Sequence, residues 1–249
     1  MASRSEKKSN KNDNPKRKTR AQVRSETERA RQRRIALIAG AVVIAVLVAV
    51  GLIWSNRDSS DLPTLQVADA AELSGIPTDG RVIGDPNAPL HLVEYGDYQC
   101  PACASFATQV FPELLSSYIA PGKVSFEFRD LAFLGNDSVT AAQAAACAVP
   151  QNGFWLYHET MYKNHYGENL GNLSTSRLLD MAELSGLDRD QIASCLNDGT
   201  TAAEVQAMHQ EATQLGIAST PSFVLNGELI QWQGWDAMKQ SLDAALANQ

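Results

Sequence analysis

The chain has 249 residues, enough for one or two domains, and a formal net charge of −7. The total hides an asymmetry, because residues 1–34 hold thirteen Lys/Arg and four Asp/Glu, a net of +9, whereas residues 35–249 carry a net of −16. This split excludes a uniformly acidic protein and indicates two parts that face different environments.

The basic segment 1–34 has almost no large apolar residues, so we expect it to be disordered. Basic charge directly before an apolar run is typical of a cytoplasmic topology signal that is attracted to anionic lipid. We do not expect it to bind nucleic acid, because no aromatic residue is interleaved for stacking on bases.

Residues 35–54, IALIAGAVVIAVLVAVGLIW, carry no charge and are long enough for a helix to cross a membrane. The positive-inside rule then leaves the N-terminus in the cytoplasm and places the rest of the chain outside. The alternative is a cleaved signal peptide with a site near Ala49-Val50-Gly51, but its apolar core would normally be only about 7–15 residues long. We therefore predict a single-pass anchor in the cell membrane, with all four cysteines on the oxidising, extracytoplasmic side.

The remaining elements follow in chain order. Residues 55–80 have the composition of a linker, and we expect the folded domain to occupy 81–249. Patterns predict a strand at 90–96, an amphipathic helix from 103 to 118 kinked at Pro112, a strand at 123–130, helices over about 136–215, a hairpin at 223–232 and a last helix at 235–247. This order predicts an α/β sandwich with a helical insertion.

Two cysteines, Cys100 and Cys103, lie where the first long strand gives way to the first helix. A helix start favours an anion, which lowers a thiol pKa and suits Cys100 to be a thiolate nucleophile. Pro101 suits the first helical turn. Cys103 lies one turn further on the apolar face, where it could attack a mixed disulfide formed at Cys100.

Two other interpretations of these cysteines compete with a redox pair. A structural clip would close so small a loop that it would add little stability. A structural zinc site needs four ligands, and the chain has no second pair of cysteines at this spacing. A metal would require Cys147 and Cys195 as well, and we predict no metal site.

The segments EYGDYQCPAC and STPSFVLNG together resemble the DsbA-like thiol–disulfide oxidoreductases of the thioredoxin superfamily. The resemblance covers about residues 81–249 and implies a thioredoxin-like fold with a helical insertion, preceded here by the transmembrane helix. It implies that Cys100 attacks and Cys103 resolves. Pro221 then matches the superfamily's cis-proline, and the backbone of Thr220 would pair with an extended substrate. An ordinary proline at a strand entry is the alternative for Pro221.

Glu94 matches a position where this family often has a buried acid beneath the cysteines. It shares a strand face with Leu90 and Leu92, so burial would raise its pKa and allow it to relay a proton to or from Cys103. The alternative is an acid at a strand end that reaches water. Between the cysteines, Ala102 replaces the histidine of many strongly oxidising members, so Pro101 and Ala102 leave the strength of the oxidant open.

The other two cysteines, Cys147 and Cys195, lie on apolar faces of predicted helices. Four cysteines allow three pairings, and if Cys100 pairs with Cys103 the other two remain. Some members of the family carry a second bridge in the insertion, which fits a structural disulfide. Two buried free thiols are the alternative. We expect His158 and His165 to be surface or core residues rather than catalytic ones.

The resulting hypothesis is a membrane-tethered enzyme that donates the Cys100–Cys103 disulfide to exported proteins that carry thiols. The resemblance implies reoxidation by an integral-membrane, quinone-linked partner, and we expect no bound cofactor. A reductase or isomerase would use the same residues. A metallochaperone or adaptor module is a non-enzymatic alternative that would bind copper or zinc at the two cysteines.

Overall fold

The computed structural model describes residue 40 and residues 62–249. The basic segment 1–34 and the predicted anchor 35–54 therefore lie outside the described residues, with the exception of Gly40. Within the part of the chain that is described, no helix combines the length and the apolar character needed to cross a membrane.

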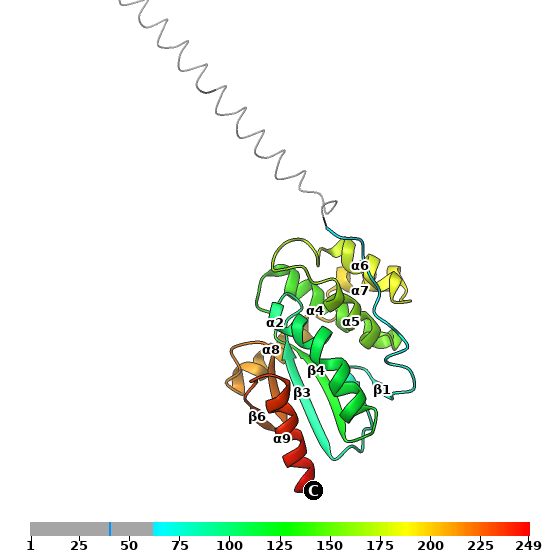
Figure 1. Cartoon of the computed structure of the whole chain (residues 1–249). Helices are drawn as coiled ribbons and strands as arrows, with labels where there is room; N and C mark the ends of the chain where they lie inside the picture. Colours follow the sequence, from blue (N-terminus) through cyan, green and yellow to red (C-terminus); the bar gives the residue numbers. More distant parts are fainter. Residues whose placement is uncertain (1–39, 41–61) are drawn as a thin grey trace, which may run out of the picture. The chain divides into compact units, whose positions relative to one another are not determined.

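A six-stranded sheet with the order β1-β2-β4-β3-β5-β6 forms the centre of the domain (Figure 1). The long central strands β3 and β4 run parallel, and the other neighbours are antiparallel. A parallel pair needs a crossover, which the first long helix supplies. The strands are β1 Thr78–Asp79, β2 Val82–Ile83, β3 Leu90–Gly96, β4 Val124–Asp130, β5 Ser222–Leu225 and β6 Glu228–Ile230.

Helices cover this sheet and form the insertion between β4 and β5. The bounds are α2 Pro101–Ser105, η2 Phe106–Val110, α3 Phe111–Leu114, η3 Leu115–Ile119, α4 Asn136–Ala148, η4 Val149–Gln151, α5 Phe154–Lys163, α6 Thr175–Leu184, α7 Arg189–Asp198, α8 Ala202–Gln214 and α9 Trp235–Ala247. The insertion α4–α8 occupies the range that the sequence predicts, so the fold is a thioredoxin-like α/β fold with a helical insertion.

The first long helix is not regular. It widens into π-helical turns at η2 and η3, on either side of the short α3 segment that contains Pro112. Proline cannot donate to the carbonyl four residues earlier, and a π-turn next to it is a known way for a helix to absorb that loss. The expected kink therefore takes the form of two widened turns.

The alternation along β3 decides which side chains reach which face. Leu90 and Leu92 are fully buried in the main core, beneath the first helix, α5 and α9. Val93 and Tyr95 point to the opposite face, where they form a smaller cluster with Ala212 of α8. By the same alternation, Glu94 falls on the main-core side of the sheet.

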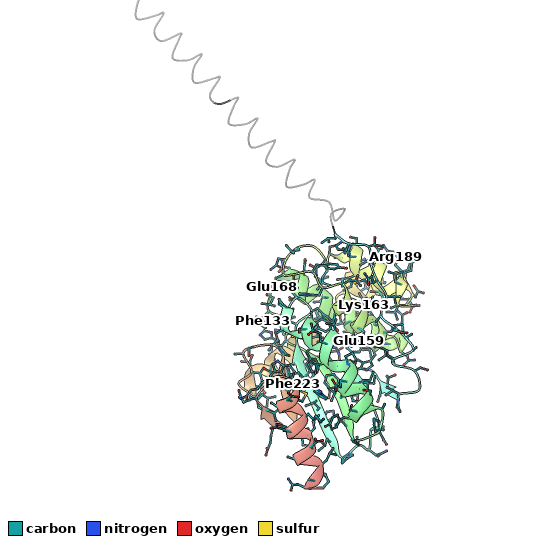
Figure 2. All side chains as sticks on the ribbon, viewed as in Figure 1. Phe133, Glu159, Lys163, Glu168, Arg189 and Phe223 are labelled. Carbon is teal, nitrogen blue, oxygen red and sulfur yellow. A yellow bond between two sulfur atoms is a disulfide. The ribbon has the colours of Figure 1, made fainter. Side chains whose placement is uncertain are left out.

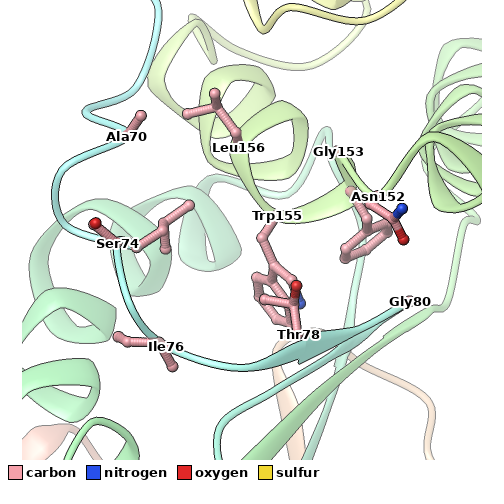
Figure 3. Close-up of a pocket in the computed structure, with 11 residues that line it drawn as sticks. Ala70, Ser74, Ile76, Thr78, Gly80, Asn152, Gly153, Trp155 and Leu156 are labelled. Carbon is pink, nitrogen blue, oxygen red and sulfur yellow. The ribbon is translucent and has the colours of Figure 1, made fainter.

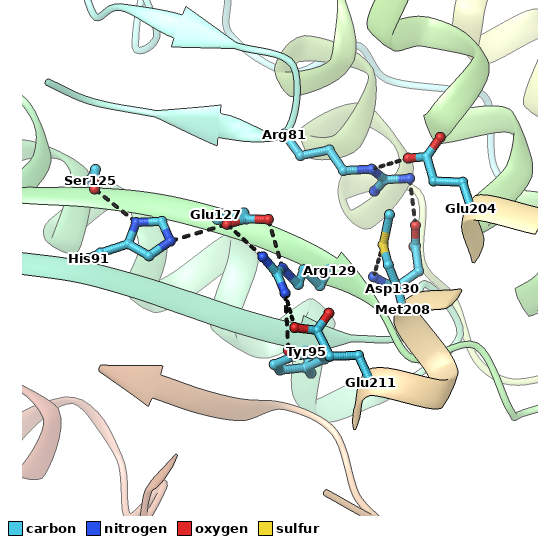
Figure 4. Close-up of polar contacts among 10 residues, drawn as sticks. All are labelled: Arg81, His91, Tyr95, Ser125, Glu127, Arg129, Asp130, Glu204, Met208 and Glu211. Carbon is cyan, nitrogen blue, oxygen red and sulfur yellow. Dashed lines mark hydrogen bonds and ion pairs between the residues drawn. The ribbon is translucent and has the colours of Figure 1, made fainter. Parts of the chain in front are cut away.

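Charged side chains link α8 to β4 and to the residue before β2 (Figure 4). Arg81 places Nη2 2.8 Å from Asp130 Oδ2 and donates through Nε to Glu204 Oε1 at 3.0 Å. Arg129 of β4 pairs with Glu211, about two turns further along α8. Because Arg81 and Asp130 are almost fully buried, this network contributes to the domain's interior and not only to its surface.

Residues before Arg81, which we expected to form a linker, also contact the domain. The amide of Gln66 donates to Asn164 Oδ1 at 3.0 Å, and Asn164 Nδ2 donates back to the carbonyl of Gln66 at 2.7 Å. The amide of Ala68 donates to Thr160 Oγ1 at 3.1 Å. The folded part of the chain thus reaches further toward the N-terminus than the sequence pattern indicates.

A cavity of about 250 Å³ lies between this N-terminal segment and the start of α5 (Figure 3). Ser74, Ile76 and Thr78 line one side, and Trp155 and Leu156 line the other. None of the cysteines lines it.

Candidate active site

The two cysteines of the CPAC segment stand at the junction of β3 and the first helix. Cys100 is the N-cap residue of α2, with extended backbone angles of φ −76° and ψ 120°, and Pro101 follows at the first helical position. Cys100 retains 7% of its surface and Cys103 none. Both are free thiols in the structure.

The loop before β5 lies against Cys100. The Thr220–Pro221 peptide bond is cis, and Cys100 Sγ lies 3.4 Å from the carbonyl oxygen of Thr220. Because Ser222 of β5 pairs with Tyr95 of β3, the sheet itself holds this loop next to the cysteines. The structure therefore brings together Cys100, Thr220 and Pro221, although 120 residues separate the first two.

The surroundings of Cys100 favour its thiolate. A hydrogen bond from the Cys103 side chain lowers the pKa of the Cys100 thiol to about 6, against the opposing effect of partial burial. The Thr220 side chain and the backbone N–H groups of Cys103 and Ala102 act in the same direction. A thiol with this pKa is mostly ionised at neutral pH, which makes it both a reactive nucleophile and a good leaving group.

The surroundings of Cys103 act in the opposite direction. Burial raises its pKa well above the ordinary value for a thiol, and both the hydrogen bond to Cys100 and the charge of Glu94 add to this effect. The pair therefore consists of one thiol that ionises easily and one that holds its proton.

Glu94 is 2% exposed and lies on the face of β3 that the sequence predicts. Its Oε1 atom is buried and has no hydrogen-bond partner. Burial raises the pKa of this carboxyl well above its usual range, and the charges of Glu159 and Cys100 raise it further. Burial therefore favours the protonated form of Glu94, close to Cys103.

Pro101 and Ala102 occupy the exposed surface between the cysteines. Neither side chain can donate a hydrogen bond to the thiolate. What this stretch contributes to Cys100 comes from the backbone, through the N–H group of Ala102.

A groove of about 420 Å³ lies next to the Thr220–Pro221 loop, and its lining includes Ala102, Ile230 and Trp232 but neither cysteine. A polypeptide in this groove would lie next to both the Cys100 sulfur and the backbone of residue 220.

Asp97 is a buried residue of the site that the sequence analysis missed. Its side chain accepts from the amides of Gln99 at 2.8 Å, Phe133 at 2.9 Å and Leu134 at 3.1 Å, and its carbonyl accepts from the amide of Cys100 at 2.9 Å. Asp97 thus shapes the loop that delivers Cys100. An aspartate directly after a buried strand and a glycine was the only local signal.

The remaining candidates from the sequence are the second pair of cysteines and two histidines. Cys147 and Cys195 form a disulfide between α4 and α7, with their Cα atoms 6.0 Å apart. These two cysteines are therefore not available as metal ligands, and in the described part of the chain no group of three or more His, Cys, Asp or Glu could hold a metal. His158 is buried and its Nδ1 lies 2.9 Å from the hydroxyl of Tyr98, while His165 bonds a backbone carbonyl.

Known proteins resemble this chain over most of its length. A family model described as Thioredoxin matches residues 77–244. The Probable disulfide bond formation protein D of Bacillus cereus is 29% identical over 209 residues, which cover 82% of this chain and 93% of the relative. The Disulfide bond formation protein D of Bacillus subtilis is 27% identical over 169 residues, or 66% of this chain and 76% of the relative.

Solved structures show the same fold. Oxidised BdbD from Bacillus subtilis has a TM-score of 0.64 at 24% identity and covers 75% of this chain and all of its own. Chlamydia trachomatis DsbA has a TM-score of 0.62 at 20% identity, with 75% of this chain and 98% of its own covered. With the family match and the paired thiols of opposite character, the chain belongs to the thioredoxin family, as a DsbA-like thiol–disulfide oxidoreductase.

Proposed function

We propose that this enzyme is tethered to the cell membrane and donates a Cys100–Cys103 disulfide to exported proteins. The low pKa of Cys100 beside the high pKa of Cys103 supports transfer of the disulfide from the enzyme to the client. Stabilising the thiolate of the attacking cysteine stabilises the reduced form, and an easily reduced pair is an oxidant.

The transfer follows from the two thiols in two balanced steps. A client thiolate attacks Cys100 Sγ, the Cys100–Cys103 bond breaks, and the sulfur of Cys103 takes a proton, for which Glu94 is the donor that we propose. A second client thiolate then attacks the client sulfur of the mixed disulfide. Cys100 leaves as a thiolate and the client gains a disulfide. The Cys100–Cys103 pair ends in its reduced dithiol form, having accepted two electrons from the client.

The groove beside Thr220 supports binding of an extended client chain. Main-chain hydrogen bonds to Thr220 would hold a client without selecting its sequence. This suits an enzyme that acts on many exported proteins.

The proposed location rests on the sequence of residues 1–54 and on the Cys147–Cys195 disulfide. A disulfide that stabilises a fold is typical of proteins outside the cytosol. We further propose that an integral-membrane redox partner removes the two electrons and restores the Cys100–Cys103 bond.

Trapping tests this function directly. In cells that express Cys103→Ser, mixed disulfides between Cys100 and client proteins should accumulate and appear on non-reducing electrophoresis. The double variant Cys100→Ser, Cys103→Ser is the matched control and should trap nothing. If the single variant also traps nothing, and Cys100→Ser leaves the thiol state of exported proteins unchanged, the proposed function is wrong.

A further inference from the structure

Gln99, the residue directly before Cys100, is fully buried although its side chain is polar. Its Nε2 donates to the carbonyl of Leu134 at 3.1 Å and to Ser138 Oγ at 3.1 Å, and its Oε1 accepts from the amide of Asn169 at 2.6 Å. Both ends of the amide are therefore used. Buried amides bonded this completely usually fix one conformation.

The backbone of Gln99 is held as well. Its amide donates to Asp97 Oδ1 at 2.8 Å, and its carbonyl accepts from Nε2 of His165 at 2.9 Å. Three separate segments thus converge on one residue: the loop after β4, the first turn of α4 and the loop between α5 and α6. The last two belong to the helical insertion.

We propose that Gln99 is a positioning residue, which fixes the backbone at Cys100 so that its sulfur lies against the N–H groups of Ala102 and Cys103 and against the Thr220 loop. Cys100 has an extended conformation at the helix start, and a small rotation about its backbone would move the sulfur away from those donors. The insertion thus fixes the backbone conformation of Cys100 through its hydrogen bonds to Gln99. The proposal rests on the proposed role of Cys100 as the exchanging thiol.

The same bonds connect Gln99 to two exposed loops, one directly after β4 and one within the insertion. Leu134 follows Phe133, which is 46% exposed, and Asn169 precedes Leu170, which is 59% exposed. Phe133 and Glu168 mark these two loops in Figure 2. A displacement of either loop would act on Gln99, and through it on Cys100.

The thiolate fraction of Cys100 is the readout, because a role in filling space alone would not change it. Gln99→Met keeps the volume but removes every side-chain hydrogen bond. We expect the pKa of the Cys100 thiol in the reduced variant to rise by about one unit, toward the ordinary value for a free cysteine of roughly 8.5. At pH 6 this corresponds to a loss in the alkylation rate with iodoacetamide of about fivefold.

Tyr157→Phe is the matched control in the same insertion. It also removes a buried hydrogen bond, from the Tyr157 hydroxyl to the carbonyl of Leu178 at 2.9 Å. This variant should lose stability and keep the alkylation profile of the wild type. A folded Gln99→Met variant with the wild-type profile would overturn the proposal.

If Gln99→Met does not fold, Ser138→Ala tests the positioning role of Gln99 instead. It removes one acceptor of Gln99 Nε2 and changes little else, so the pKa of Cys100 should rise by a smaller amount in the same direction. An unchanged profile here would also overturn the proposal. Failure of the proposed function is distinguishable, since it would leave the wild-type thiol titration intact while the trapping experiment captured no client.

Discussion

Two chemically identical thiols, one helical turn apart, differ because of what surrounds each of them. Cys100 keeps contact with solvent and receives hydrogen bonds that stabilise its thiolate. Cys103 is enclosed, and both its burial and the charge of the nearby Glu94 carboxyl raise the pKa of its thiol. Opposite pKa changes in neighbouring groups assign them different roles in proton transfer and exchange. At this scale the chemistry follows from burial and hydrogen bonding, not from residue type.

Replacement of Glu94 tests the proton relay. Glu94→Gln keeps the shape of the side chain but cannot deliver a proton to Cys103. We expect oxidation of a model dithiol peptide to slow by about 10²-fold at pH 7 in stopped-flow measurements, as for loss of a positioned acid. The pKa of Cys100 should change little. An unchanged rate would show that water protonates Cys103 instead.

Glu159 of α5 should make the domain less stable at alkaline pH. Burial and the charge of Glu72 raise the pKa of this carboxyl to about 8, from an unfolded value of about 4.3. The folded state therefore retains the proton longer, and its contribution to stability is complete below about pH 4 and is lost as the pH rises to about 8.

Urea unfolding at pH 5 and pH 8 measures this loss. The free energy of unfolding should fall between the two pH values in the wild type, and it should fall less in Glu159→Gln. Glu113→Gln changes an exposed carboxyl of the first helix and should behave as the wild type. An equal fall in all three proteins would contradict the expectation.

At the scale of elements, local patterns were sufficient wherever one face of an element is buried. The alternation in 90–96 and 123–130 and the hairpin pattern in 223–232 predicted β3, β4 and the β5–β6 hairpin, because each pattern depends only on neighbours in sequence. The short strands β1 and β2 carry no such pattern. They form by pairing in the folded sheet, where β2 pairs with β4 and β1 pairs with β2.

The same limit applies to the site. Both cysteines, Glu94 and the Thr220–Pro221 pair could be found from motifs. Asp97 and Gln99 could not, because their partners lie 35 to 70 residues away and only the folded insertion brings them near. Their importance depends on contacts that no local pattern records.

The buried ion pair between Arg81, directly before β2, and Asp130, at the end of β4, should stabilise the fold far more than an exposed ion pair does. Arg81 is 8% exposed and Asp130 1%, so Arg81→Ala would leave a buried carboxylate without its partner. We expect the free energy of unfolding to fall by about 3–5 kcal/mol. Arg189→Ala breaks the exposed pair with Asp180 and should cost less than about 1 kcal/mol. Similar losses in both variants would contradict this ranking.

At the scale of the whole molecule, one pair of cysteines stabilises the fold and the other pair performs the exchange chemistry. Cys147–Cys195 links α4 to α7 across 48 residues of the insertion, whereas Cys100 and Cys103 lie at the sheet and remain free thiols. The disulfide thus closes the insertion at the last turn of α4, and the first turn of the same helix bonds Gln99 through Ser138. A rigid insertion suits the positioning that we propose for that residue.

Removal of the structural disulfide should reduce stability without removing the chemistry. The chain-entropy model gives a loop of this length about 4 kcal/mol, so Cys147→Ser with Cys195→Ser should lower the free energy of unfolding by about that amount. Chemical denaturation measures the loss. Below the unfolding transition the double variant should still oxidise a dithiol peptide. Loss of exchange in the folded variant would instead place Cys147 or Cys195 in the reaction.

The central claim is that the Cys100–Cys103 pair is an oxidant that donates its disulfide. The redox equilibrium of this pair with glutathione tests that claim most directly. The fraction of oxidised protein is measured by alkylation and mass spectrometry across a series of glutathione ratios. The low pKa of Cys100 predicts a potential clearly more oxidising than the roughly −270 mV of thioredoxin. A potential at or below that value would contradict the account and make the enzyme a reductase.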